Sequence, residues 1–204
     1  MSLRTASRLT TKANSLPHHN VRTFLTLPNT STTQHLTALR TLPYAPSPLY
    51  DLIADVDSYS SFVPYCSRSR VTAWSNADPA HHDRSWPTLA DLHVGWGGFE
   101  EVFTSRLRCV PGESVEAISG GDGEGDASAV FKSLVTRWAL RPLDAAAGSE
   151  AKPRTEVHLS IKYQFANPLY AAVSSAVSDK VAGLMIEAFE KRAREKLGRS
   201  HDSL

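Results

Sequence analysis

The C-terminal part of the chain restricts the fold most, because it joins a sharply alternating strand pattern to a very long helix pattern. Across residues 155–165, apolar side chains occupy every second position, which is typical of a β-strand with one buried face. Across residues 167–197, apolar side chains recur with helical spacing, Pro168 follows the candidate cap Asn167, and Gly198 comes directly after the pattern. Since an apolar sheet face must be covered, we expect this helix to lie across the sheet.

Similar patterns upstream predict the rest of the sheet. Strands are expected at residues 34–41, 68–74, 88–96, 99–110, 114–119 and 131–143. Polar or glycine-rich segments at 76–87, 120–129 and 144–153 are expected to be loops. The chain is therefore predicted to be an α+β protein with a helix-grip fold, in which a curved antiparallel sheet wraps around the long C-terminal helix. Such an arrangement tends to leave an apolar cavity between the sheet and the helix.

A shorter helix and an aromatic corner are expected between the first two strands. Ser47 is the candidate cap and Pro48 the first helical position, where a missing N–H group costs nothing. The apolar stripe of this helix consists of Leu49, Leu52, Ile53 and Val56. The segment that follows carries Tyr59, Phe62 and Val63 and ends at Pro64.

Charge divides the chain into a basic leader and a mildly acidic domain. Residues 1–50 contain five basic side chains and no acid, which leaves 17 basic against 21 acidic residues in the remainder. Residues 1–33 are rich in Ser and Thr with scattered Arg, as in a mitochondrial transit peptide; the alternative is a disordered tail with no targeting role. We expect the folded domain at 34–198 and a short tail at 199–204. This balance does not suggest a nucleic-acid partner.

Signatures of catalysis and of metal binding are missing from the sequence. It contains neither a phosphate-binding loop with its Lys nor a dinucleotide-binding fingerprint. His81 and His82 lie beside two aspartates in a loop but lack the spacing of zinc ligands. Cys66 and Cys109 have no evident paired base and are expected to be small buried thiols. We therefore expect no catalytic residue, no metal site and no cofactor.

Glu101 is the one charge on an otherwise apolar strand face, that of Phe99, Phe103 and Leu107. A carboxylate in such a place is costly without a partner. Three roles remain open: an ion pair with an arginine such as Arg70 or Arg137, contact with a polar ligand head, or acid–base catalysis.

Large aromatic side chains are the other candidate feature. Eight are expected to point inward around the long helix: Phe62, Trp74, Trp96, Phe99, Phe103, Trp138, Tyr163 and Phe165. Such a set can line an apolar pocket or fill a solid core, and the pattern by itself favours neither.

Four motifs make the chain resemble a known family. They are DLIADVDSYSSFVPYCSRSRV (51–71), VGWGGFEEVFTSRL (94–107), LVTRWAL (134–140) and VAGLMIEAFEKRAREKLG (181–198). Together they resemble the mitochondrial coenzyme Q-binding proteins of the START-like, polyketide-cyclase-related superfamily. Tyr65 stands where that family often has Trp, and the loops at 76–87 and 120–129 are unusually long.

The resemblance implies a non-catalytic protein that binds ubiquinone in the helix-grip cavity and acts as its carrier or chaperone. It implies a role in respiration and ubiquinone synthesis, at the matrix side of the mitochondrial inner membrane and in peripheral contact with it. A long ubiquinone tail would need an opening at the membrane or a homo-oligomer. The expected lipid contacts are Phe62, Val63, Phe99, Glu101, Phe103, Leu107, Trp138, Val177, Val181 and Leu184, with Glu101 near the headgroup.

Two alternatives stay open. One is a cyclase or aromatase of the same superfamily that uses Glu101 and a histidine. The other is a ribosome-association module like those described for bacterial relatives, which the net negative charge of the domain disfavours.

Overall fold

The computed structural model describes residues 33–96, 99–120, 130–143 and 152–198, without the side chains of residues 96, 99 and 168–179. The expected transit segment up to residue 32 and the expected tail at 199–204 lie outside these ranges. The loops expected at 120–129 and 144–153 also lie mostly outside the described ranges.

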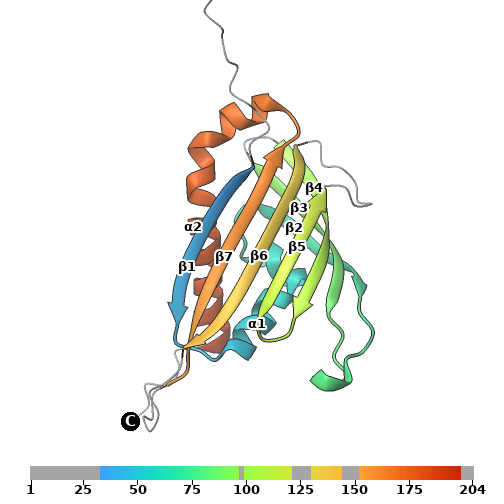
Figure 1. Cartoon of the computed structure of the whole chain (residues 1–204), viewed down its shortest axis with the longest axis vertical. Coiled ribbons are helices and arrows are strands. Elements are labelled where there is room, and N and C mark those ends of the chain that lie inside the picture. The colour runs from blue at the N-terminus through green and yellow to red at the C-terminus, as the bar shows by residue number, and fades with distance from the viewer. Residues whose placement is uncertain (1–32, 97–98, 121–129, 144–151, 199–204) are drawn as a thin grey trace, which may run out of the picture.

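Seven antiparallel strands form one curved sheet, in the order β1-β7-β6-β5-β4-β3-β2 (Figure 1). The strands are β1 (Gln34–Leu42), β2 (Cys66–Trp74), β3 (Pro87–Trp96), β4 (Phe99–Val110), β5 (Ser114–Gly120), β6 (Phe131–Leu143) and β7 (Arg154–Phe165). Strands β2 to β7 pair in sequence order, and β1 returns beside β7. All the expected strands are present, because alternation with one apolar face is a strong local signal.

Helices cover the concave face of this sheet unevenly. The long helix α2 (Pro168–Leu197) packs mainly against β1 and β7, and α1 (Pro46–Ala54) packs against β5 and β6 at the lower end of the view. A 3-10 turn, η1 (Val56–Ser61), packs on β2. Arg40 of β1 also pairs with Glu187 and Glu190 of α2, at 3.8 and 3.5 Å. The middle of the sheet, from β3 to β5, is left without a long helix over it.

The predicted start of α1 was wrong by two residues. The helix begins at Pro46 after Ala45, which caps without a side-chain hydrogen bond, so Ser47 is not the cap. Prolines fit this first turn because its N–H groups have no partner within the helix. The expected stripe is otherwise present, with Leu49 and Ile53 at 0% and 1% exposure.

The buried face of α2 is rotated from the apolar stripe that the sequence pattern predicts, which consists of Tyr170, Val173, Val177, Val181, Leu184 and Ala188 and is widened by Met185 and Phe189. Ala182, Ile186, Phe189 and Ala193 are its most buried residues. Leu184, which we expected on the covered stripe, is 37% exposed. The reason lies in packing: Ala182 and Ala193 are small and allow a close approach to the sheet, which places Leu184 on the outer side.

One further correction concerns the last residue of β2. Trp74, expected to point inward, is 54% exposed, and the neighbouring Trp86 is buried instead. The loop at 76–87 contains a 3-10 turn, η2 (Pro79–His81), where the Asp78 carboxylate accepts hydrogen bonds from the Ala80 backbone N–H and the His81 ring.

No helix in the described ranges is both long and apolar enough to cross a bilayer.

Candidate functional site

A cavity of about 450 Å³ lies between the concave face of the sheet and the middle of α2. This volume is typical of small-molecule sites, which range from about 300 to 1,000 Å³. The wall is formed mainly by the inward faces of strands β3 to β7, by the segment after η1, and by Val181 and Met185 of α2. Most of these side chains are aliphatic or aromatic.

Small side chains in the middle of the sheet explain why space remains there. Ser105 of β4, Ala117 and Ser119 of β5, and Thr136 of β6 all line the cavity. The sequence supplies large inward residues on either side, such as Phe103 and Trp138, but not at these four positions. The helix α2 packs mainly on β1 and β7, and the described α2 side chains that line the cavity are Val181 and Met185.

Burial distinguishes a closed end from an open end. Val56, Val115 and Trp138 are at most 6% exposed; α1 packs on β5 and β6, the strands of Val115 and Trp138, and Trp138 contacts Phe189 of α2. The lining residues Val94, near the end of β3, and Glu101, near the start of β4, are half-buried, and Tyr65 is 41% exposed. The cavity therefore approaches solvent at the end where β3 meets β4.

Four aromatic rings form the wall between β4 and β7. The ring centroid of Phe131 lies 5.6 Å from those of Phe103 and Tyr163 and 4.9 Å from that of Phe165. Phe131 and Phe165 face each other across the β6–β7 pair. These contacts give a continuous apolar surface, which suits a chain-like hydrocarbon better than a polar substrate.

The aromatic corner after α1 completes the wall near the open end. The Tyr59 hydroxyl donates a 2.5 Å hydrogen bond to the carbonyl of Ile53, and the Tyr59 ring packs edge-on against Phe62. Burial raises the pKa of the Tyr59 phenol above its ordinary value. Tyr65 has a positive φ of 65°, and its carbonyl accepts from the N–H of Gly95 on β3 at 2.9 Å. The corner is thus tied to both α1 and the sheet.

Most of the expected lipid contacts with described side chains line this cavity: Val63, Glu101, Phe103, Leu107, Trp138 and Val181. Phe62 does not; it packs against the core, with the Arg192 guanidinium 5.2 Å from its ring centroid. Leu184 lies on the outer side of α2, away from the lining. The side chains of Phe99 and Val177 are outside the described residues.

Several lining residues were missed by sequence reasoning. Ser105 and Ser119 lie 14 residues apart, and their hydroxyl oxygens approach to 2.6 Å on neighbouring strands. Ser105 occurs on the inward face of the 99–110 pattern, between Phe103 and Leu107, so alternation could have identified it. Nothing in the local pattern indicates that Ser119 meets it, because strand register is a long-range property.

Glu101 lines the cavity close to the open end, opposite Val94 on β3. Arg137, one of its expected partners, instead forms an ion pair with Glu116 of β5 on the outer face, at 3.7 Å. An ion pair between Glu101 and Arg137, one of the pairings expected from the sequence, is therefore not formed.

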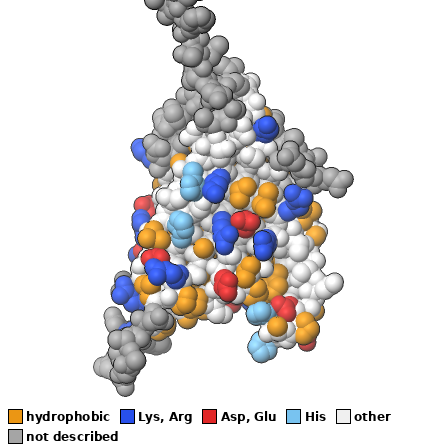
Figure 2. Space-filling model, viewed as in Figure 1, with side chains coloured by type: hydrophobic (Ala, Val, Ile, Leu, Met, Phe, Trp, Pro, Cys, Tyr) orange, Lys and Arg blue, Asp and Glu red, His pale blue; other side chains and the backbone are white. Residues whose placement is uncertain are grey.

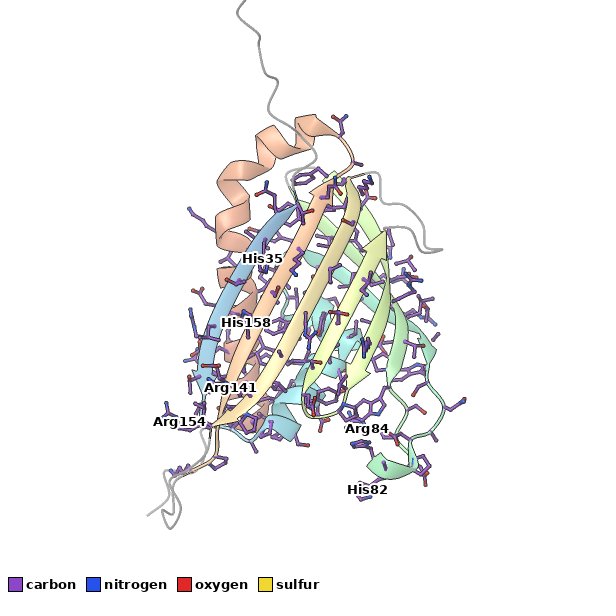
Figure 3. All side chains as sticks on the ribbon, viewed as in Figure 1. His35, His82, Arg84, Arg141, Arg154 and His158 are labelled. Atoms are coloured by element: carbon purple, nitrogen blue, oxygen red, sulfur yellow. The ribbon has the colours of Figure 1, made fainter. Side chains whose placement is uncertain are left out.

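The histidines that the structure describes lie away from the cavity lining. His35 and His158 project from the outer face of β1 and β7, where charged and apolar side chains are mixed (Figures 2 and 3). His35 shares a 2.9 Å hydrogen bond with Ser160 there, and His82 lies in the loop after β2. Among the described lining residues there is no histidine.

The described residues include two free thiols, Cys66 and Cys109. No group of three or more His, Cys, Asp or Glu side chains in those ranges is arranged to hold a metal ion. Cys66 lines the cavity and is buried, while Cys109 is half-buried beside the Pro87 carbonyl. Burial raises the pKa of both thiols, which lowers their nucleophilic thiolate fraction.

The sequence is similar to one protein family and to several characterised proteins. The family described as polyketide cyclase/dehydrase and lipid transport matches residues 42–190. The mitochondrial coenzyme Q-binding protein of Schizosaccharomyces pombe is 35% identical over 161 residues, which cover 78% of this chain and 86% of that protein. The ribosome association toxin RatA of Pseudomonas aeruginosa is 29% identical over 165 residues, 80% of this chain and 98% of that protein.

The structure is also similar to solved structures of the same architecture. The Zhui aromatase/cyclase from a Streptomyces species superposes with a TM-score of 0.64, covering 85% of this chain and all of that one, at 15% sequence identity. Likeness at such low identity is a likeness of fold. It confirms the predicted helix-grip architecture, a curved antiparallel sheet with a long C-terminal helix.

Proposed function

Since the chain belongs to the polyketide cyclase/dehydrase and lipid transport family, and within it is related to the mitochondrial coenzyme Q-binding proteins, we propose that it binds ubiquinone in the cavity. One observation carries the proposal: the cavity of about 450 Å³ is walled almost entirely by apolar side chains and reaches the surface beside Tyr65. Transfer of an isoprenoid from water to such a wall is favourable by about 25 cal/mol per Å² of apolar surface buried.

The biological role that follows is that of a carrier or chaperone for ubiquinone. Polyprenyl quinones partition into membranes, so a protein that shields the ring and the first part of the tail would allow the lipid to leave the bilayer. We place the protein in mitochondria, at the matrix side of the inner membrane and in peripheral contact with it, in support of respiration and ubiquinone synthesis. A full-length tail is longer than the cavity, so its distal part would remain outside.

The direct test is lipid analysis of the purified protein. The full chain is produced in a bacterium that makes ubiquinone, purified without detergent, extracted and measured by mass spectrometry. Ubiquinone at close to one molecule per chain supports the proposal. If the protein is folded and free of lipid, and takes up no ubiquinone from vesicles, the proposal is wrong. Salt-sensitive co-sedimentation with ribosomes would then be the next measurement, given the similarity to RatA.

A further inference from the structure

Apart from Glu101 near the open end, the wall of the cavity is largely apolar, and three hydroxyl groups form a polar spot in it. Ser105 and Ser119 are 5% and 6% exposed, and their oxygens lie 2.6 Å apart across the β4–β5 pair. Thr136 belongs to the next strand, β6, where it lies opposite Ala117, two residues before Ser119. All of these residues line the cavity, so the three hydroxyls occupy three adjacent strands of one wall.

Counting hydrogen bonds shows that donors remain available at this spot. Each serine has one O–H group, and the contact between the two oxygens uses only one of them. Within the described residues, no acceptor is placed for the second serine proton or for the Thr136 proton. An O–H group that has no acceptor in the protein can donate to a ligand, so this part of the wall suits a ligand that accepts hydrogen bonds.

The chemistry of an oxidised ubiquinone head matches that requirement. The ring carries two carbonyl and two methoxy oxygens, which are all acceptors, and it has no polar hydrogen to donate. A carboxylate is also an acceptor when ionised, so Glu101 offers such a head no hydrogen bond in that state. Hydroxyl groups do offer one: Ser105 and Ser119 are buried lining residues, and Thr136 is a half-buried one.

The shape of the cavity wall also favours binding of the quinone ring beside the three hydroxyl groups. Ala117 is the only side chain between Thr136 and Leu107 in its row of the sheet, which leaves room for a flat ring against the wall. Phe103, Phe131 and Phe165 extend from this spot towards the half-buried end of the lining and can contact an isoprenoid chain. The ring would occupy the space over the small residues, and the tail would follow the aromatic wall outward.

We propose that Ser105, Ser119 and Thr136 form the headgroup subsite, and that ubiquinone enters ring first with its tail directed to the open end near Tyr65. The inference rests on the proposed function and goes further, since it assigns the polar contacts and the direction of the bound lipid. It also differs from the sequence-based expectation that Glu101 lies near the headgroup.

The test compares a ligand that has the head with one that lacks it. Binding of ubiquinone with a two-isoprene tail and of squalene, a hydrocarbon without a polar head, is measured for the full chain and for Ser105→Ala/Ser119→Ala. The double variant removes both members of one mutual hydrogen bond, so the folded state loses little. We expect its Kd for the quinone to rise about tenfold, as for the loss of about one net hydrogen bond, and its affinity for squalene to stay unchanged.

Ser114→Ala is the matched control, because Ser114 is also a buried serine of β5, at 7% exposure, but does not line the cavity. An unchanged quinone affinity in the double variant, or an equal loss for quinone and squalene, would overturn the subsite. If the unaltered chain binds squalene but no quinone, or binds neither, the proposed function fails instead.

A second measurement needs no variant, in case the double variant does not fold. Infrared spectra of carbonyl-labelled ubiquinone bound to the unaltered chain report hydrogen bonding directly, because donation to a carbonyl lowers its stretching frequency. We expect at least one carbonyl band below its position in hexane. Two bands at their hexane positions would contradict hydroxyl contacts with the head.

Discussion

The indole of Trp138 and the ring of Phe189 lie with their centroids 5.0 Å apart, and this contact joins β6 to α2 at the closed end of the cavity. The two residues are 6% and 2% exposed. Trp138 lines the cavity, whereas Phe189 lies behind it in the packed core. The contact therefore marks the boundary between the empty and the filled parts of the space under α2.

Phe189→Ala is expected to destabilise the protein by about 3–5 kcal/mol, because the deleted ring leaves a void that a rigid core fills only partly. The free energy of unfolding in urea, measured without ligand, checks this. Leu184→Ala on the outer side of the same helix is the control and should cost less than 1 kcal/mol beyond helix propensity. A loss below 1 kcal/mol for Phe189→Ala would show that α2 is not anchored at this point.

Val181→Lys is expected to abolish ubiquinone retention while the domain remains folded. Val181 is a half-buried cavity residue, so a lysine there places a charge beside the lipid and can still extend its ammonium towards water. Leu184→Lys is the matched variant, three residues along the same helix but outside the lining, and should retain the lipid. Mass spectrometry of bound lipid and circular dichroism are measured for both. Equal retention by two folded variants would place the lipid elsewhere.

Cys66 is expected to report cavity occupancy through its rate of alkylation. Its raised pKa and its burial should make the reaction slow near neutral pH, and the rate should increase as the pH rises. Bound ubiquinone should slow it further, because Cys66 lines the cavity. The Cys109→Ala variant isolates this thiol, and the Cys66→Ala variant isolates Cys109, which is outside the lining and should react at a rate independent of ligand. Protection of Cys109 alone would contradict the location of the site.

Tyr59→Phe is expected to lower the free energy of unfolding by about 1–3 kcal/mol, because the Ile53 carbonyl loses its 2.5 Å donor. This difference should be constant at pH values well below 10, where the phenol is protonated in both the folded and the unfolded states. Burial raises the pKa of the folded-state phenol above the ordinary value of 10.0. Above pH 10 the unfolded chain releases this proton before the folded one does, so the original protein should lose stability more steeply than Tyr59→Phe.

Denaturant titrations from pH 7 to 11 check the alkaline prediction. Tyr65→Phe is the control, since Tyr65 is 41% exposed and its substitution should leave the stability unchanged. Parallel pH profiles for the original protein and Tyr59→Phe would indicate that the Tyr59 hydroxyl reaches solvent.

Local pattern was a good guide to which residues point inward along a strand. Phe103, Leu107 and Trp138 were expected on the buried face and line the cavity. The same reasoning failed for Trp74, which lies at the end of an edge strand, where alternation continues although nothing covers the side chain. It also failed for Leu184, because a broad helical stripe does not specify which of its edges faces the sheet.

By itself, the sequence determined the seven strands, the two helices and the largely apolar character of the inner face, because these depend on side-chain periods within single segments. Only the tertiary structure decided that a cavity remains and that Ser105 meets Ser119 inside it. Both depend on strand register and on the position of α2 over β1 and β7, which arise from packing between segments distant in the chain. An empty volume is the difference between the space enclosed by the backbone and the side chains that fill it, so no single segment specifies it.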